Sequence, residues 1–337
     1  MPTPQTNTTL AAIAQHFAEL DDFVICGHVN PDGDCLGSQL TLMHGLHAAG
    51  KRAVCLLAKP DPIDANLAFL PGIDEMVPAA SYDGPVGAFV AVDVPTVERI
   101  GQAAALHDGA PVRFTIDHHA ADVAMAEYTF VEPESPSASM LVWDIVRMLD
   151  AVTPDAALCA LTGLITDTGR FAYQNTTPAA FRAAAEMMEA GASPALVNRE
   201  FFQNRSLPSL ALERLVLERM EISEDGGFVV SYLDQADFDE VGAIKADVEP
   251  LIDSLRSVRG ARVALILREN NDHEVRGSLR AKDDHTDVAA VARRFGGGGH
   301  TAAAGFTFKG SLAEARVEVP RVVRELCFAD ACEVAHG

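Results

Sequence analysis

Short apolar runs alternate with longer amphipathic stretches from residue 20 to about residue 195. Four runs are apolar throughout, as are strands of a parallel sheet that is covered on both faces, and they span residues 23–26, 53–57, 88–92 and 112–116. The amphipathic stretches predict helices over residues 35–49, 137–149, 154–165 and 178–190. This alternation predicts an α/β domain with a parallel sheet and helices on both of its faces.

Capping residues mark where several of these helices begin. Thr153, Thr177 and Ser193 each precede a proline, so that a hydroxyl group can accept from the first turn while proline occupies the first helical position. Gly191 suits the end of the helix before it. These positions predict helix boundaries at residues 154, 178 and 194.

The pattern changes in the second part of the chain. Residues 194–222 are predicted to be helical, with one interruption at Pro208. A helical segment of this length suits a connector between domains better than a flexible tether. After Gly226 and Gly227, strands are predicted at 229–233 and 263–267 and helices at 248–258 and 286–295. We therefore expect a first domain over residues 1–193, a helical connector over 194–224 and a smaller α/β domain over 225–337.

Composition and charge narrow the function. The 337 residues are 48% hydrophobic, which is enough for two cores. A protein that binds a long nucleic acid needs a cation for each phosphate that it neutralises. This chain has a net charge of −22 and no Lys/Arg tract. Any nucleic-acid substrate should be short and bound within a cleft, and long nucleic acid is not expected as a partner.

The chain carries no sign of secretion or membrane insertion. Residues 1–23 lack the basic and apolar regions of a signal peptide, and no apolar run approaches the ~20 residues that span a bilayer. Six cysteines are scattered without CxxC spacing and sit mostly in apolar segments, which is typical of buried free thiols in a reducing compartment. We expect a soluble, cytoplasmic protein.

Acidic and imidazole side chains follow three of the predicted strands. Residues 27–34, Gly-His-Val-Asn-Pro-Asp-Gly-Asp, come after the first strand, Asp93 after the third and Asp117-His118-His119 after the fourth. The carboxyl ends of parallel strands share one edge, where α/β proteins bind ligands. The first loop alone also fits an Asx-rich turn that caps a helix. A fourth candidate, Asp167, follows the helix predicted to end at residue 165.

These segments provide six nitrogen and oxygen ligands and no thiolate. Such a set favours Mn²⁺ or Mg²⁺, with Co²⁺ or Zn²⁺ as further candidates, and it is too large for one open catalytic ion. Two ions joined by a bridging carboxylate would use all six ligands. A site with two such ions indicates metal-dependent hydrolysis. Asp117 is expected to orient the ring of His118. The six candidate ligands are His28, Asp32, Asp34, Asp93, His118 and Asp167.

In order and spacing, these motifs resemble those of the DHH phosphoesterase superfamily. Residues 296–300, Gly-Gly-Gly-Gly-His, followed by Ala-Ala-Ala-Gly at 302–305, resemble the DHHA1 nucleotide-binding motif. The resemblance extends from about residue 20 to residue 325. It implies a second domain with a mixed sheet, and hydrolysis of phosphate esters in short oligonucleotides and in 3′-phosphoadenosine 5′-phosphate (pAp).

The resemblance also implies a role for each residue. His28 and Asp32 would hold one metal ion, Asp34, His118 and Asp167 the other, and Asp93 would bridge them around a nucleophilic water. His119, beside Asp117, would donate to the scissile phosphate. The expected substrate contacts in the second domain are Ser278, Arg280, Gly297, Gly298, Gly299 and His300. Two simpler interpretations of that region stay open: a merely flexible loop for the glycine run, and an exposed charge at the end of a strand for Arg280.

Several other functions share part of this pattern. A RecJ-like exonuclease acting on longer strands is disfavoured by the missing basic tracts, and a family II pyrophosphatase by the glycine motif. Hydrolysis of cyclic dinucleotides or of their linear products stays open. A nucleotide-binding regulator should have lost a metal ligand, whereas all six are present. The sequence leaves the oligomeric state open, with a homodimer among the candidates, and gives Cys35 a structural or incidental role.

Overall fold

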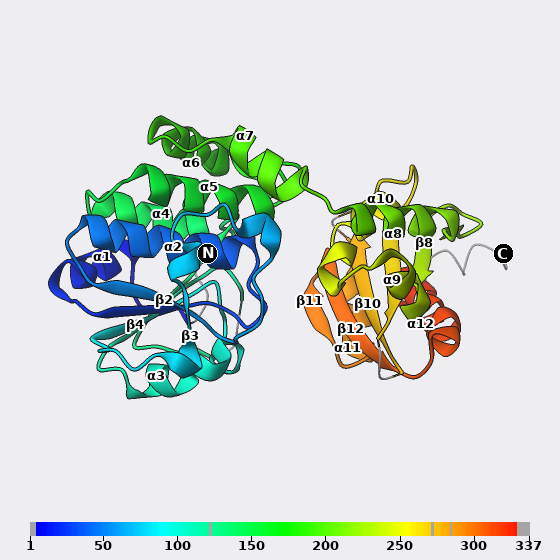
Figure 1. Cartoon of the computed structure of the whole chain (residues 1–337), viewed down its shortest axis with the longest axis horizontal. Helices are drawn as coiled ribbons and strands as arrows, with labels where there is room; N and C mark the ends of the chain where they lie inside the picture. Colours follow the sequence, from blue (N-terminus) through cyan, green and yellow to red (C-terminus); the bar gives the residue numbers. More distant parts are fainter. Residues whose placement is uncertain (1–4, 121–122, 271–272, 284, 329–337) are drawn as a thin grey trace. The chain divides into compact units, whose positions relative to one another are not determined.

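The structure is a computed structural model that describes residues 5–120, 123–270, 273–283 and 285–328. The chain divides into two compact units, Met1–Asn204 and Arg205–Gly337 (Figure 1). The segment predicted as a connector, 194–224, is shared between them. In the described residues, we find no helix of the length and apolarity that crossing a bilayer would require.

The first unit contains a six-stranded parallel sheet in the order β3-β2-β1-β4-β5-β6. The order reverses at β1, which lies between β2 and β4, and such a reversal is where open α/β sheets form a ligand crevice at their carboxyl edge. The strands are β1 (Phe23–Cys26), β2 (Ala53–Leu57), β3 (Val77–Pro78), β4 (Ala88–Val92), β5 (Arg113–Asp117) and β6 (Tyr128–Val131).

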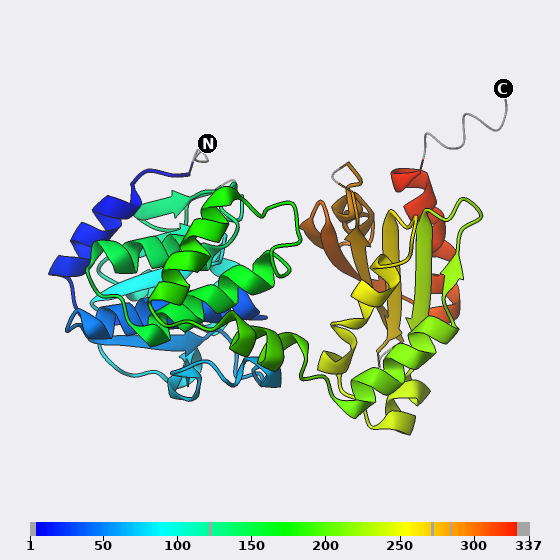
Figure 2. The same ribbon diagram turned by 90° about the horizontal axis from the view of Figure 1, so that it is seen from above.

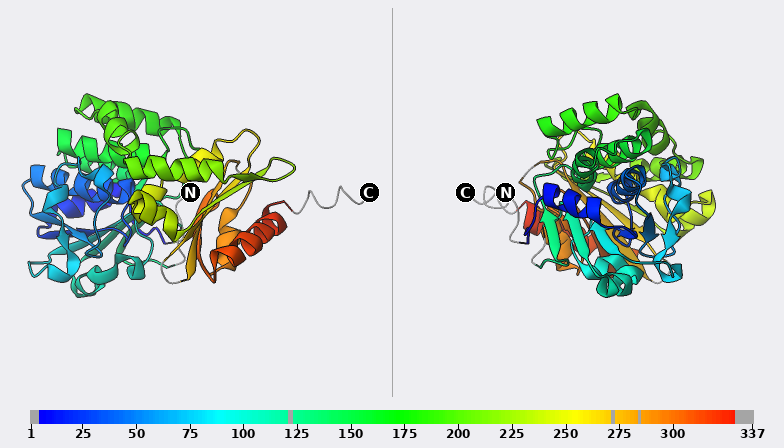
Figure 3. Two further views of the ribbon diagram at one scale, coloured as in Figure 1. Left: turned by 45° about the vertical axis from the view of Figure 1, so that its right-hand side comes forward. Right: turned by 90° about the vertical axis from the view of Figure 1, so that its left-hand side faces the viewer.

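Helices cover both faces of this sheet, as predicted. One face packs Ile25, Val90 and Phe114 against α1, α2 and α4, and the other packs Val24 and Phe89 against α3 and the 3₁₀ segment before it (Figure 3, right). The α-helices of this unit are α1 (Leu10–Glu19), α2 (Gly33–Ala48), α3 (Ala104–Gly109), α4 (Ala138–Met148), α5 (Pro154–Asp167), α6 (Pro178–Glu189) and α7 (Pro194–Val197). Its short 3₁₀ and π segments are η1 (Ala65–Leu67), η2 (Ile73–Glu75), η3 (Ala79–Ser81), η4 (Val97–Ala103) and η5 (Asn198–Phe202).

Local chemistry explains how these helices begin and how they pack. Thr153, Thr177 and Ser193 cap α5, α6 and α7 and accept from the backbone three residues on, which confirms the predicted starts. The backbones of helices α2 and α5 lie close together at Gly37. A Cβ at this position would lie only 2.7 Å from the carbonyl oxygen of Cys159. A Cβ at Gly33 would likewise lie 2.4 Å from Thr166 Oγ1, so the first turn of α2 lies against the last turn of α5.

The second unit contains a mixed six-stranded sheet in the order β11-β12-β10-β9-β8-β7. Strands β8 and β9 are parallel and the other pairs are antiparallel, so the predicted fold class is confirmed for both units. The strands are β7 (Glu221–Ile222), β8 (Phe228–Leu233), β9 (Val263–Glu269), β10 (Glu274–Ala281), β11 (Gly298–His300) and β12 (Ala303–Lys309).

Alternate residues of β9 supply two separate cores. Val263, Leu265 and Leu267 pack against α11 and α12, whereas Ala264 and Ile266 pack against α8, α9 and α10 on the opposite face. Figure 2 and the left view of Figure 3 show α12 along one side of this sheet. The bounds are α8 (Leu207–Glu218), α9 (Gln235–Val241), η6 (Lys245–Val248), α10 (Leu251–Arg256), α11 (Val288–Arg294) and α12 (Leu312–Cys327).

Two predicted helices differ from the structure around prolines. Pro208 does not interrupt a helix but lies in the first turn of α8, where its missing N–H has no intrahelical acceptor to lose. Ser206 caps that turn by accepting from Ser209 N. The helix predicted over 248–258 is shorter, because Pro250 separates the 3₁₀ turn η6 from α10.

Candidate metal centre and nucleotide-binding face

The candidate ligands of the first unit gather at the carboxyl edge of the sheet, around the reversal of strand order. His28 follows β1, Asp93 follows β4 and His118 follows β5. Asp34 lies in the first turn of α2 and Asp167 is the last residue of α5. The close packing of α2 and α5 therefore brings residues distant in sequence to the same edge.

Asp93 lies between two histidines. Its Oδ2 atom is 3.4 Å from His28 Nε2, and its Oδ1 atom is 3.4 Å from His118 Nε2. These distances exceed an ordinary N–H···O hydrogen bond of about 2.7 to 3.2 Å. They match the roughly 3.0 to 3.4 Å that separates neighbouring ligand atoms each about 2.1 Å from one ion. The buried Oδ1 atom makes no hydrogen bond to any described residue.

The backbone of Asp93 is itself unusual. Its φ angle is +54°, in the left-handed region that few residues other than glycine adopt. The Asp93 amide donates to Ile116 O at 3.1 Å, which ties the end of β4 to β5. Strained backbone of this kind concentrates at functional sites, where the surrounding structure holds it in place.

A second cluster surrounds His118. Its Nε2 atom is 3.7 Å from Asp34 Oδ2 and 3.6 Å from Asp167 Oδ2. Ligand atoms of Asp34, His118 and Asp167 all lie within 4.8 Å of one another, as do those of Asp93, His118 and His119. His118 and Asp93 therefore connect two adjoining groups of ligand-type atoms, as a pair of neighbouring ions requires.

Hydrogen bonds from the surroundings fix these side chains. His118 Nδ1 is 3.2 Å from Ser135 O, which turns its other nitrogen toward the carboxylates. The two oxygens of Asp34 accept from Ala138 N at 2.7 Å and Ser139 N at 2.9 Å, in the first turn of α4. Sequence reasoning missed these contacts, and its one signal was the predicted start of a helix near residue 137.

Asp117 orients a different ring from the one expected. Its Oδ1 atom accepts from the backbone amides of His118 and His119 at 2.7 and 3.1 Å, and it lies 2.9 Å from His119 Nδ1. The carboxylate turns back over the two following residues, so it reaches the ring of His119 while that of His118 is held by Ser135. The expectation that Asp117 orients the His118 ring is wrong.

Asp32 and Cys35 lie at the margin of the site. Asp32 caps α2 by accepting from Asp34 N and Cys35 N, and its other oxygen is 3.8 Å from His28 Nε2. Asp32 thus forms the capping turn and lies beside His28, and its role as a metal ligand stays a prediction. Cys35 is buried, and its sulfur lies within 4.8 Å of ligand atoms of His28 and Asp93, which sequence reasoning did not anticipate.

The electrostatics of the cluster favour a cation. Burial raises the pKa of Asp34 to about 7, and burial together with Asp34 raises the pKa of Asp167 well above its ordinary value. Burial lowers the pKa of His118, but the surrounding carboxylates outweigh it and raise that pKa far above its usual range. Carboxylates crowded this closely repel one another, and a divalent ion would relieve that repulsion. The residues therefore fit a metal site.

The predicted nucleotide contacts of the second unit share one face of its sheet. Ser278 and Arg280 on β10 pair with Gly305 and Ala303 on β12, and Gly298 on β11 pairs with Gly305 in turn. These side chains alternate with Val275 and Leu279, which enter the core on the opposite face. The polar positions of β10 and the glycine strand β11 therefore belong to the same rows of the sheet, with β12 between them.

Glycine is suited to each of these positions for a different structural reason. A Cβ at Gly297 would lie 2.2 Å from Gly305 O, and Gly299 has a φ of +141° and lies equally close to Ala303 O. Both let β11 fold against β12. Gly298 is exposed, and a Cβ there would meet no described atom within 4 Å. The His300 side chain lies outside the described residues.

Residues 22–164 match the DHH family N-terminal domain and residues 225–325 match the DHHA1 domain. Together with the relatives below, these matches show that the chain belongs to the DHH/DHHA1 phosphoesterases, which are hydrolases that use divalent metal ions.

Two similar proteins are each described as a bifunctional oligoribonuclease and PAP phosphatase NrnA. The Thermus thermophilus protein is 32% identical over 89% of this chain and 89% of its own length, and the Bacillus subtilis protein is 25% identical over 85% and 88%. Among solved structures, an exopolyphosphatase-related protein from Bacteroides fragilis has a TM-score of 0.87 at 25% identity and covers 94% of this chain and 96% of its own. Thermus thermophilus RecJ with Mn²⁺ shares the fold, at a TM-score of 0.53 and 14% identity, with 94% and 53% covered.

Proposed function

We propose that this chain hydrolyses phosphate esters of short oligonucleotides and of pAp with the help of two divalent metal ions, most suitably Mn²⁺. One observation carries the proposal: the two oxygens of the buried Asp93 face two different imidazoles, His28 and His118. One carboxylate thus serves two adjoining ligand groups. The shared description of the relatives as oligoribonuclease and PAP phosphatase supports the substrate class.

We assign the ligands to two ions. His28 and Asp32 would hold one ion, a second group of three residues would hold the other, and Asp93 would contact both. Two bound ions supply Lewis-acid stabilisation of the phosphate and lower the pKa of a water molecule that attacks it. The second group consists of Asp34, His118 and Asp167, whose ligand atoms lie within 4.8 Å of one another.

His119 is the proposed donor to the scissile phosphate. The contact between its Nδ1 and the Asp117 carboxylate at 2.9 Å fixes the direction of the ring. Asp117 is wholly buried, so this contact is shielded from water. His119 would hold its proton beside the phosphate oxygens, where negative charge increases during hydrolysis.

The second unit is the proposed holder of the nucleotide. Arg280 can form a charge-assisted hydrogen bond to a phosphate or a base edge, and the exposed backbone at Gly298 allows close approach. Ser278, Gly297, Gly299 and His300 complete the proposed contacts. We accordingly assign catalysis to residues 1–193, connection to 194–224 and nucleotide binding to 225–337.

Two further properties support short substrates inside a cell. The net charge of −22 repels the phosphates of a long strand beyond the site. The five described cysteines are free thiols, and four of them are buried, in keeping with a reducing cytoplasm.

A turnover panel tests the function. The purified chain with Mn²⁺ is compared on pAp, a dinucleotide, a 5-mer, a 20-mer, a cyclic dinucleotide and pyrophosphate, with EDTA as the control. We expect fast Mn²⁺-dependent hydrolysis of pAp and the dinucleotide. A preference for the cyclic dinucleotide or for pyrophosphate would replace the proposed substrate class, and turnover in EDTA would exclude the proposed chemistry.

A further inference from the structure

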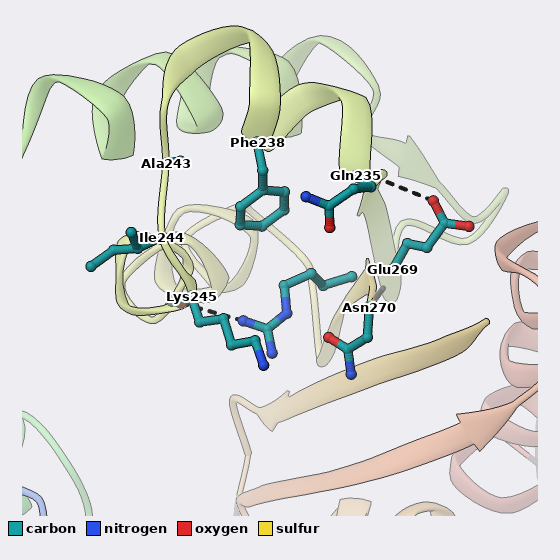
Figure 4. Close-up of a pocket in the computed structure, with 8 residues that line it drawn as sticks. Gln235, Phe238, Ala243, Ile244, Lys245, Glu269 and Asn270 are labelled. Carbon is teal, nitrogen blue, oxygen red and sulfur yellow. Dashed lines mark hydrogen bonds between the residues drawn. The ribbon is translucent and has the colours of Figure 1, made fainter. Parts of the chain in front are cut away.

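A pocket of about 260 Å³ lies in the second unit, next to the carboxyl ends of the parallel strands β8 and β9 (Figure 4). Leu233, the last residue of β8, pairs with Arg268 near the end of β9. The lining residues are Gln235, Phe238, Ala243, Ile244, Lys245, Arg268, Glu269 and Asn270.

Arg268 is the central polar group of this pocket. Within the described residues its guanidinium makes one hydrogen bond, from Nη1 to Lys245 O at 3.3 Å, and its buried Nε has no hydrogen-bond partner. Burial lowers the pKa of Arg268, with Glu249 and Arg276 acting in opposite senses. A partly buried guanidinium with an unbonded nitrogen is costly to maintain, and a bound anion would satisfy it.

A second cation beside Arg268 points to an anion as the ligand. Lys245 also lines the pocket, and Figure 4 shows its side chain extended toward the middle. The acidic neighbour Glu269 is turned to the start of α9, where its Oε2 accepts from Gln235 N at 3.3 Å. Two basic side chains thus share one small cavity in a chain whose net charge is −22.

The other walls narrow the chemistry of the anion. Phe238 and Ala243 form an apolar side, which can pack against a planar ring, and the amides of Gln235 and Asn270 can bond to a base edge. Inorganic phosphate would leave the apolar side uncovered. The volume of about 260 Å³ lies just below the roughly 300 to 1,000 Å³ of small-molecule pockets, which limits the ligand to at most one nucleotide.

We propose that this pocket is a nucleoside monophosphate site, in which Arg268 and Lys245 hold the phosphate and the apolar side receives the base. It lies on the same face of the sheet as Ser278 and Arg280 and differs from the proposed substrate contacts in its position along the strands. Arg268 pairs with Arg276 and Ala264 pairs with Arg280, so Arg268 and Arg280 differ by four positions along the sheet, about 13 Å at ~3.3 Å per residue. The proposal does not depend on the proposed hydrolytic function.

Calorimetric titration of the full chain with 5′-AMP in EDTA tests the site. EDTA removes metal-dependent binding, and an Arg280→Ala background weakens binding at the proposed substrate face. We expect that background to bind one AMP per chain, and Arg268→Gln or Lys245→Gln to weaken this binding at least tenfold. Arg294→Gln is the matched control, because exposed Arg294 lies on α11, which packs on the opposite face of the sheet.

The outcomes separate the alternatives. Absence of AMP binding in the Arg280→Ala background, or binding that Arg268→Gln leaves unchanged, would overturn the proposal. Inorganic phosphate binding as tightly as AMP would overturn the nucleoside part. Arg268→Gln should melt at the same or a higher temperature, since it removes an unsatisfied charge, so weakened binding in a folded variant supports the site. Hydrolysis is not measured, so failure of the proposed function leaves this result intact.

Discussion

Asp117 Oδ1 lies 2.9 Å from His119 Nδ1, so a wholly buried carboxylate orients the ring proposed to face the scissile phosphate. Asp117→Asn keeps an oxygen for the backbone amides but removes the carboxylate that holds the His119 ring in place. We expect kcat to fall about 100-fold or more with bound metal retained. Steady-state kinetics on a dinucleotide and metal analysis measure both quantities.

The chain provides a matched control for this change. Asp108 Oδ1 lies 2.9 Å from His107 Nδ1, the same pairing outside the proposed site. Asp108→Asn should leave kcat unchanged. Equal kinetics for Asp117→Asn and the unmodified chain would remove His119 from the mechanism.

Gly163 makes the approach of Asp34 to α5 possible. A Cβ at Gly163 would lie 2.6 Å from Asp34 Oδ1 and 2.5 Å from Ser139 Oγ. Gly163→Ala should therefore displace Asp34, weaken Mn²⁺ binding at least tenfold and lower the free energy of unfolding by about 1 to 3 kcal/mol. Metal titration and thermal unfolding test this.

Gly109→Ala serves as the control for Gly163→Ala. Gly109 is the last residue of α3, and a Cβ there would meet no described atom within 4 Å. Its stability should stay the same or rise by up to about 1 kcal/mol. Unchanged Mn²⁺ affinity in Gly163→Ala would show that Asp34 is not held as described.

Substrate length should matter strongly. Outside the site a long strand gains few cationic contacts and is repelled by the net charge of −22. We expect kcat/KM at physiological salt to be at least ~tenfold lower for a 20-mer than for a dinucleotide, with a smaller gap at high salt, where repulsion is screened. Equal rates on both substrates would favour a RecJ-like exonuclease.

Arg280 should act on nucleotide binding alone. Arg280→Ala removes a charge-assisted contact of roughly 1.5 to 3 kcal/mol, which corresponds to about a ten- to a hundred-fold loss of kcat/KM for pAp. Bis-(p-nitrophenyl) phosphate has no nucleoside to hold, so its hydrolysis should change far less. Kinetics on both substrates make the comparison.

His119→Ala is the complementary variant, because both substrates contain a scissile phosphate and both should be damaged. Folding and metal content are checked for each protein. An equal loss of both activities in Arg280→Ala would place the second domain within the catalytic group.

The sequence predicted most of the fold because its signals are local. The apolar runs at 23–26 and 88–92 and the Thr-Pro and Ser-Pro caps depend on neighbouring residues, and the structure confirms them. The exception at Pro208 arises because proline both ends and begins helices, and the sequence alone does not distinguish the two.

The missing parts of the candidate site depend on tertiary contacts. Ser135 O beside His118 and the α4 amides beside Asp34 are backbone groups brought in from distant segments, and they carry no residue signature. Cys35, for which the sequence predicts a structural or incidental role, approaches ligand atoms of Asp93 only through the folding of the chain. The pocket around Arg268 gave no signal, since its walls come from separate elements.

The central claim is that the carboxylate cluster around Asp93 holds two ions. The most direct measurement is the number of Mn²⁺ ions bound per chain, determined by calorimetry and by elemental analysis after removal of free metal. We predict two ions for the unmodified chain, and at most one for a folded Asp93→Asn variant, which should also lose hydrolysis of pAp. One ion in the unmodified chain, or two ions in active Asp93→Asn, would contradict the two-metal account.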